Sequence, residues 1–154
     1  MTERSPRIQV ALIVGALAIL VSGWVHFSLY FRGGYRGIHP DEFAGITISR
    51  SFALNAIAAV VIAELLVLRL KFDALTLPSA AMGAGFGAAT IVAYFLSRTN
   101  GLLGFKETAT TTEAVIALVA EAIAILVLTP VALATWNARG ANAGRASLPS
   151  PSTT

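Results

Sequence analysis

The chain has 154 residues, of which 56% are hydrophobic and 12% are charged, and it carries a formal net charge of +3. Soluble domains contain about 25% charged residues, so this composition excludes an ordinary soluble globular protein. The chain has no cysteine, which excludes disulfides, thiolate metal sites and cysteine nucleophiles. Its basic residues gather at the ends of apolar stretches rather than along one face, so the expected partner is a lipid bilayer and not nucleic acid.

Four apolar stretches account for most of the chain, and each exceeds the roughly 20 residues that a helix needs to cross the hydrocarbon of a bilayer. We therefore predict an all-α, integral membrane four-helix bundle with antiparallel, up-down-up-down topology. The bundle domain covers residues 1–136, and its predicted spans are residues 8–31, 46–70, 74–97 and 112–136.

The first stretch follows a basic N-terminus, as in a secretory signal. It is longer than the apolar region of a signal, which has about 7 to 15 residues, and is therefore predicted to be a retained span. Arg32-Gly33-Gly34 ends it, because paired glycines favour turns. A long polar loop that contains His39 follows.

The second and third stretches are joined by a very short connection that begins Arg69-Leu70-Lys71. A connection of this length predicts that the two helices are antiparallel neighbours. The third stretch carries Gly83 and Gly87, four residues apart, in the spacing that lets helix backbones approach closely. We predict that this glycine face packs inside the bundle, with homodimerisation as the alternative.

The fourth stretch has candidate N-terminal caps at Thr110, Thr111 and Thr112. Beyond it, residues 137–154 are rich in Gly, Ala, Ser and Pro, and this tail is predicted to be disordered. Arg69 and Lys71 crowd the shortest connection, where the positive-inside rule counts most, so the connection and both termini are expected in the cytoplasm.

Polar side chains from all four predicted spans fall at matched depths on the outer side. Ser22, His26 and Tyr30 recur every four residues and share a helix face. His26 lies on the order of 8 Å from the outer end of its span, and Asn55 and Glu121 lie on the order of 13 Å from theirs. Lipid cannot satisfy such groups, so they are expected to turn inward and pair.

This clustering predicts an outward-facing polar pocket. Loop arginines at its rim would attract an anionic group, and Glu121 and His26 would set the protonation state inside it. The predicted ligand-binding residues are His26, Tyr30, Arg36, Asn55, Tyr94, Arg98, Glu107 and Glu121.

A purely structural role competes with the pocket for some of these side chains. Ser22, Ser51 and Thr90 are assigned to hydrogen bonds between helices. Asn55 and Glu121 are open to either a structural or a binding role.

Catalytic and metal chemistry lack support in the sequence. His26 is the only histidine within a predicted span, and no Glu-x-x-His or paired-histidine spacing accompanies it, so no metal site is predicted. Haem ligation is kept as an alternative. No nucleophile and base are paired by spacing, so no catalytic residue is predicted and an enzyme is the least favoured class.

Two blocks of the chain carry a family resemblance. The first reads HFSLY at 26–30, GYRGI at 34–38 and FALN at 52–55; the second reads YFLSR at 94–98 and GLLGFKE at 101–107, followed by Thr111, Thr112 and Glu121. In these blocks the chain resembles a family of small, uncharacterised four-helix membrane proteins of actinobacteria. Residues 39–42 depart from it, because similar proteins are shorter and more apolar there. The resemblance implies the topology and no activity.

The leading hypothesis is a small multi-pass protein of a bacterial inner membrane. Its pocket binds a small molecule or a lipid headgroup, or the protein serves as an accessory subunit of an envelope complex. One alternative is a redox component with haem or quinone between its helices, and another is a proton-coupled transporter, which would need to dimerise. The leading hypothesis includes no cofactor and leaves open a homo-oligomer or a larger membrane complex.

Overall fold

The computed structural model describes residues 5–38 and 41–146, with side chains described as far as residue 141. His39 and the last eight residues of the predicted tail lie outside the described residues. The described chain is helical and contains no β-strand, which confirms the all-α class. Its elements are α1 (Pro6–Arg32), η1 (Tyr35–Gly37), α2 (Ile48–Leu68), η2 (Asp73–Leu75), α3 (Thr76–Thr99) and α4 (Thr112–Ala146).

Each predicted span is a helix that is long and apolar enough to cross a membrane. The N-terminus of α4 is capped by one of the three predicted threonines, since the Thr111 hydroxyl accepts from the Ala114 N–H at 3.2 Å. Large apolar side chains cover the outside of the bundle, and Leu126, Trp136 and Trp24 are 72%, 66% and 63% exposed. In a soluble bundle such side chains would be buried, whereas lipid would cover them at no cost.

The fourth helix is longer than predicted, because α4 continues to Ala146 instead of ending near residue 136. The prediction treated residues 137–154 as one Gly-, Ala-, Ser- and Pro-rich tail. The serines and prolines all follow Ala146, however, and the segment before them is rich in alanine and arginine, which favour helix. Arg139 ties this extension to the bundle by donating from Nη2 to the Ala74 carbonyl at 2.9 Å.

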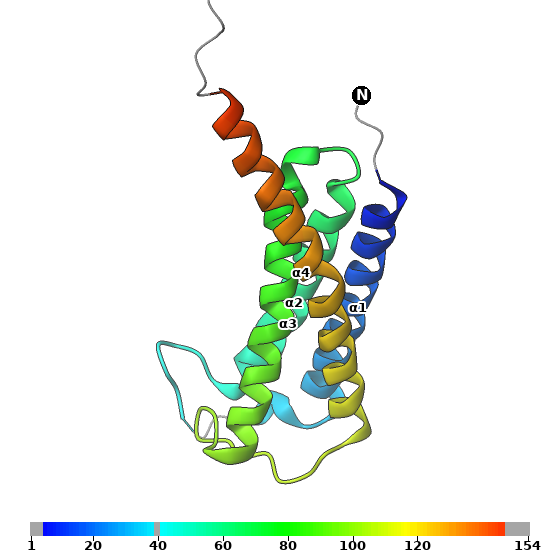
Figure 1. The fold of residues 1–154 in the computed structure, drawn as a ribbon. Helices are drawn as coiled ribbons and strands as arrows, with labels where there is room; N and C mark the ends of the chain where they lie inside the picture. The colour runs from blue at the N-terminus through cyan, green and yellow to red at the C-terminus, as the bar shows by residue number, and fades with distance from the viewer. Residues whose placement is uncertain (1–4, 39–40, 147–154) are drawn as a thin grey trace, which may run out of the picture.

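The four long helices lie side by side, and their contacts are uneven (Figure 1). Helix α1 packs extensively against α2 and α4, and α3 packs extensively against α4. Despite their short connection, α2 and α3 share a much smaller interface. In Figure 1 the η2 connection lies at the same end as the start of α1 and the end of α4, and the two longer polar loops lie at the opposite end.

The packed core depends on glycines that face a leucine. Leu128 of α4 is fully buried and fills the space beside Gly15 of α1 and Gly83 of α3. A Cβ atom on Gly87 would stand 2.8 Å from the backbone oxygen of Glu121, so α3 approaches α4 closely at this point. Gly83 and Gly87 therefore pack inside the bundle, as predicted.

Candidate functional site

A cavity of about 160 Å³ lies among the helices at the end that carries the polar loops. All four long helices, η1 and the α3–α4 loop contribute to its lining. Five of the predicted site residues line it: His26, Asn55, Tyr94, Glu107 and Glu121. These five predicted residues come from all four long helices and from the α3–α4 loop.

Glu121 of α4 is the most deeply buried acidic group in this cavity, with 3% of its surface exposed. Its Oε1 atom accepts a hydrogen bond from the Ser22 hydroxyl of α1 at 2.7 Å. The Thr90 hydroxyl of α3 lies near the same carboxyl group but donates to two carbonyl oxygens of its own helix, at 2.9 and 3.0 Å. The Ser22 hydroxyl of α1 therefore holds the Glu121 side chain of α4 in place.

His26 lies one helical turn after Ser22 and is oriented by it. The imidazole Nδ1 atom is 2.9 Å from the Ser22 carbonyl oxygen, so Nδ1 carries a hydrogen and donates it. The ring also contacts Phe52 of α2, with 5.3 Å between the ring centroids. In the neutral imidazole this tautomer leaves Nε2 as a hydrogen-bond acceptor.

Asn55 of α2 reaches the cavity with one atom unsatisfied. Its Oδ1 atom is buried and has no hydrogen-bond partner in the structure. Ser51, one turn earlier, also lines the cavity, but its hydroxyl donates to the Ile48 carbonyl at 2.7 Å. The hydrogen bond of Ser51 is therefore local, whereas Asn55 offers a free acceptor, which favours a binding role for Asn55.

Tyr35 of η1 and Glu107 of the α3–α4 loop form a hydrogen-bonded pair at the cavity. The Tyr35 hydroxyl donates to Glu107 Oε2 at 2.7 Å. Burial raises the pKa of the Tyr35 phenol above its ordinary value, and the hydrogen bond to Glu107 and its negative charge raise this pKa further. Glu107 is fixed in turn, because its N–H donates to the Ser97 carbonyl at 3.0 Å and its Oε1 accepts from the Ala109 N–H at 3.2 Å.

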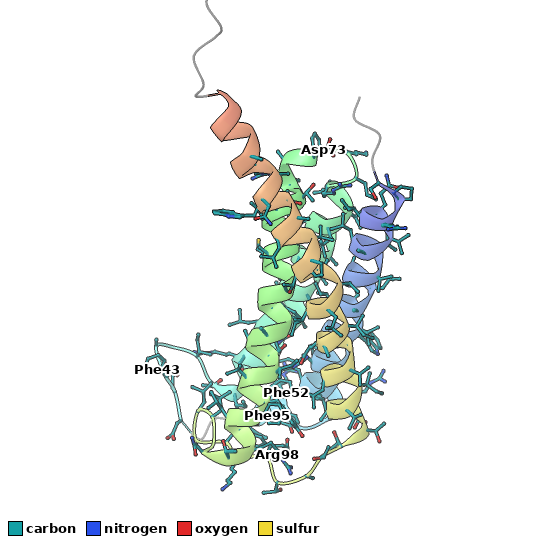
Figure 2. The ribbon with its side chains drawn as sticks, viewed as in Figure 1. Phe43, Phe52, Asp73, Phe95 and Arg98 are labelled. Carbon is teal, nitrogen blue, oxygen red and sulfur yellow. The ribbon has the colours of Figure 1, made fainter. Side chains whose placement is uncertain are left out.

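Aromatic rings form a wall of the site that sequence reasoning missed. Tyr35 stacks on Phe52 with 4.3 Å between centroids and meets Phe105 edge-on at 5.4 Å. All three line the cavity. Figure 2 shows Phe52 within the bundle near the end that carries the polar loops. The available signal was that each ring lies close in sequence to a predicted site residue: Tyr35 beside Arg36, Phe52 near Asn55 and Phe105 near Glu107.

Three predicted site residues do not line the cavity: Tyr30, Arg36 and Arg98. Tyr30 lies eight residues after Ser22 and is therefore turned about 80° around α1. Its ring meets Phe31 edge-on at 4.8 Å.

The two arginines also point elsewhere. Arg36 follows Tyr35 in a 3-10 helix, where neighbouring side chains diverge by about 120°, and its guanidinium lies 5.9 Å from the Phe31 ring centroid. Arg98 lies at the loop end of α3 (Figure 2), and its buried Nη1 atom has no hydrogen-bond partner. The cavity lining therefore lacks the expected arginines.

The chemistry of the lining is that of a polar binding site with aromatic walls. It contains two carboxyl groups and one imidazole. Among the described residues, no group of three or more His, Cys, Asp or Glu side chains could hold a metal ion. Comparison of the chain with protein-family models, curated proteins and solved structures finds no match.

Proposed function

We propose that this protein is an integral membrane protein that binds a small molecule or a lipid headgroup in its polar cavity. The observation that carries this proposal is Glu121, a buried carboxyl group in the wall of a cavity to which all four helices contribute. A carboxyl group buried among apolar helices is costly unless it is paired. Hydrogen bonds between helices do not need an acidic group, so a binding role accounts for Glu121 better than a structural one.

The proposed setting is a bacterial inner membrane that the chain crosses in up-down-up-down, antiparallel order. Both termini would lie in the cytoplasm, and the cavity would open toward the outer face between the two polar loops. The resemblance to small actinobacterial membrane proteins supports this topology. An accessory role in an envelope complex is compatible with the same site, because a partner protein could supply or receive its ligand.

Native mass spectrometry of the purified protein tests the binding proposal. Wild-type protein is expected to retain a small-molecule or lipid adduct, and Ala93→Leu is expected to lose it, because Ala93 lines the cavity and the larger side chain would fill it. Ala88→Leu is the control, since Ala88 is exposed on the same helix. An adduct that survives in Ala93→Leu, or an empty wild-type protein in both detergent and lipid nanodiscs, would contradict the proposal.

Orientation has a separate test. A reporter fused to the C-terminus is expected to give the signal of a cytoplasmic location, because the basic residues of the η2 connection favour the cytoplasmic side. An extracellular signal would reverse the topology and would open the cavity toward the cytoplasm. The binding proposal would survive that result, since the side chains of the cavity stay the same.

A further inference from the structure

Several hydrogen-bond acceptors in the cavity lining have capacity for a further donor. Ser22 donates to only one oxygen of the Glu121 carboxyl group, and Asn55 Oδ1 is buried without a partner. His26 donates from Nδ1 to a backbone carbonyl, so Nε2 of the neutral ring is a further acceptor. The Ser51 hydroxyl, a nearby donor, is already used within α2. A ligand that brings several N–H or O–H donors would complete these hydrogen bonds.

The ionisable groups of the lining favour a positively charged ligand. Glu107 and Glu121 both line the cavity, and its lining, all of whose residues are described, includes no lysine or arginine. Burying a carboxylate without a cation is costly, and a cation on the ligand would remove that cost at Glu121. The lining therefore fits a cation better than the anionic group that the sequence led us to expect.

Aromatic rings strengthen the preference for an organic cation. Tyr35, Phe52, Tyr94 and Phe105 all line the cavity. The face of an aromatic ring attracts an ammonium group within about 6 Å of its centroid. The cavity volume of about 160 Å³ is close to the roughly 150 Å³ that holds benzene, so the bound group is small.

We infer that the cavity binds a protonated primary amine, carried either by a free small molecule or by a lipid headgroup. This inference rests on the proposed function and names its ligand class. An ammonium group has three N–H donors, which match the free acceptors on Glu121, Asn55 and His26, while its charge is paired by Glu121 and faced by the aromatic rings.

Calorimetric titration of the full-length protein in detergent tests this inference with three probes of five non-hydrogen atoms each. Butylammonium is expected to bind about 10- to 100-fold more tightly than 1-butanol, because only the amine can form charge-assisted hydrogen bonds. Tetramethylammonium has the charge and no N–H donor, so it is expected to bind with intermediate affinity. Binding of 1-butanol as tight as that of butylammonium would overturn the inference, and so would equal binding of the two cations.

Two variants locate the interaction and one serves as a control. Glu121→Gln is expected to weaken butylammonium binding about 10- to 100-fold, and Asn55→Leu is expected to weaken it several-fold. Glu113→Gln is expected to change nothing, because Glu113 is exposed on the same helix and lies outside the cavity lining. Unchanged binding in Asn55→Leu and Glu121→Gln would overturn the inference. If a variant fails to fold, the comparison of the three probes on wild-type protein alone still tests whether the cavity binds a primary amine.

Nanodiscs separate the two sources of the amine and distinguish the two proposals. If phosphatidylethanolamine weakens butylammonium binding by competition while phosphatidylcholine does not, the amine belongs to a lipid headgroup. If neither lipid competes, the natural ligand is a free amine. If the adduct is neutral or anionic and Ala93→Leu abolishes it, the inference of an amine ligand is overturned and the proposed function stands. No adduct and no probe binding would overturn the proposed function as well.

Discussion

The two halves of this bundle use the same four helices in opposite ways. In the half nearest the chain termini, Leu128 fills the space between Gly15 and Gly83 and is fully buried. In the half nearest the polar loops, polar and aromatic side chains surround a cavity of about 160 Å³. We call the first the solid half, because Leu128 fills the space between its helices, and the second the hollow half, because it encloses the cavity.

This difference teaches which side chains set the distance between the helices. Where a glycine faces a leucine, the backbones approach until the leucine fills the gap, and packing is the main force between helices in lipid. In the half nearest the polar loops, the rings of Phe52, Tyr94 and Phe105 line the interior together with Asn55 and Glu121, and a space remains unfilled. Such a loss of packing is expected at functional sites.

The largest effect of a substitution is expected in the solid half, at Leu128. Leu128→Ala should lower the free energy of unfolding by about 2 to 3 kcal/mol, because it leaves a cavity between three helices. Leu126→Ala is the matched control on the same helix. Leu126 is 72% exposed, so its truncation should cost less than about 0.5 kcal/mol. Unfolding in detergent mixtures would measure both values.

Equal losses of stability in the two leucine variants would contradict the proposed difference between the two halves. They would mean that the half nearest the termini is no better packed than the outer surface. If Leu128→Ala has the larger effect and ligand binding is unchanged, the difference between the two halves is confirmed. The solid half would then be a scaffold whose stability is independent of ligand binding in the cavity.

A glycine pair on α3 tests how closely the helices must approach. Gly87→Ala is expected to cost about 1 to 2 kcal/mol, because its Cβ would stand 2.8 Å from the Glu121 backbone oxygen and would force α3 away from α4. Gly85→Ala meets no atom within 4 Å, so it should stabilise the helix by up to about 1 kcal/mol. Thermal unfolding of the two variants gives the answer, and a stabilising Gly87→Ala would show that the approach of α3 is not needed.

Much of the fold was predictable, because the four apolar runs are each long enough to cross a membrane. Such runs were predicted to be helices, since a backbone in lipid must satisfy its own hydrogen bonds. The end of α4 was not predictable from average composition. Alanines and arginines that favour helix were grouped with the serines and prolines that follow Ala146.

The site was predictable to the extent that depth and helical phase determine it. His26, Asn55 and Glu121 lie within helices, where 1.5 Å and 100° per residue locate a side chain, and all three line the cavity. Arg36 and Tyr35 are neighbours in η1, a short 3-10 helix that the sequence did not predict, so the sequence did not indicate which of them turns inward. The structure places Tyr35 in the lining and leaves Arg36 exposed.

The smallest effect is expected at Tyr35 and Glu107 in the lining of the cavity. Tyr35→Phe removes the hydrogen bond to Glu107, so it should cost about 1 kcal/mol at neutral pH. The raised pKa of Tyr35 means that the folded state holds the phenol proton more tightly than the unfolded state does. Stability from this group is present below about pH 10, where an unfolded tyrosine titrates, and is lost as the pH rises further. The free energy of unfolding, measured by denaturation, should therefore be higher for the wild type than for Tyr35→Phe at pH 8, and this difference should shrink at pH 11.

Tyr94→Phe is the control for this prediction. The Tyr94 hydroxyl lies 3.4 Å from the exposed Thr110 hydroxyl, so its removal should change stability by less than about 0.5 kcal/mol. If Tyr35→Phe were equally mild at pH 8, the Tyr35–Glu107 pair would not hold the loops over the cavity. A clear difference between the two tyrosines would instead show that the half-buried Tyr35–Glu107 hydrogen bond joins η1 to the α3–α4 loop. That hydrogen bond would hold the two polar loops together beside the cavity, while the half nearest the termini holds the helices together.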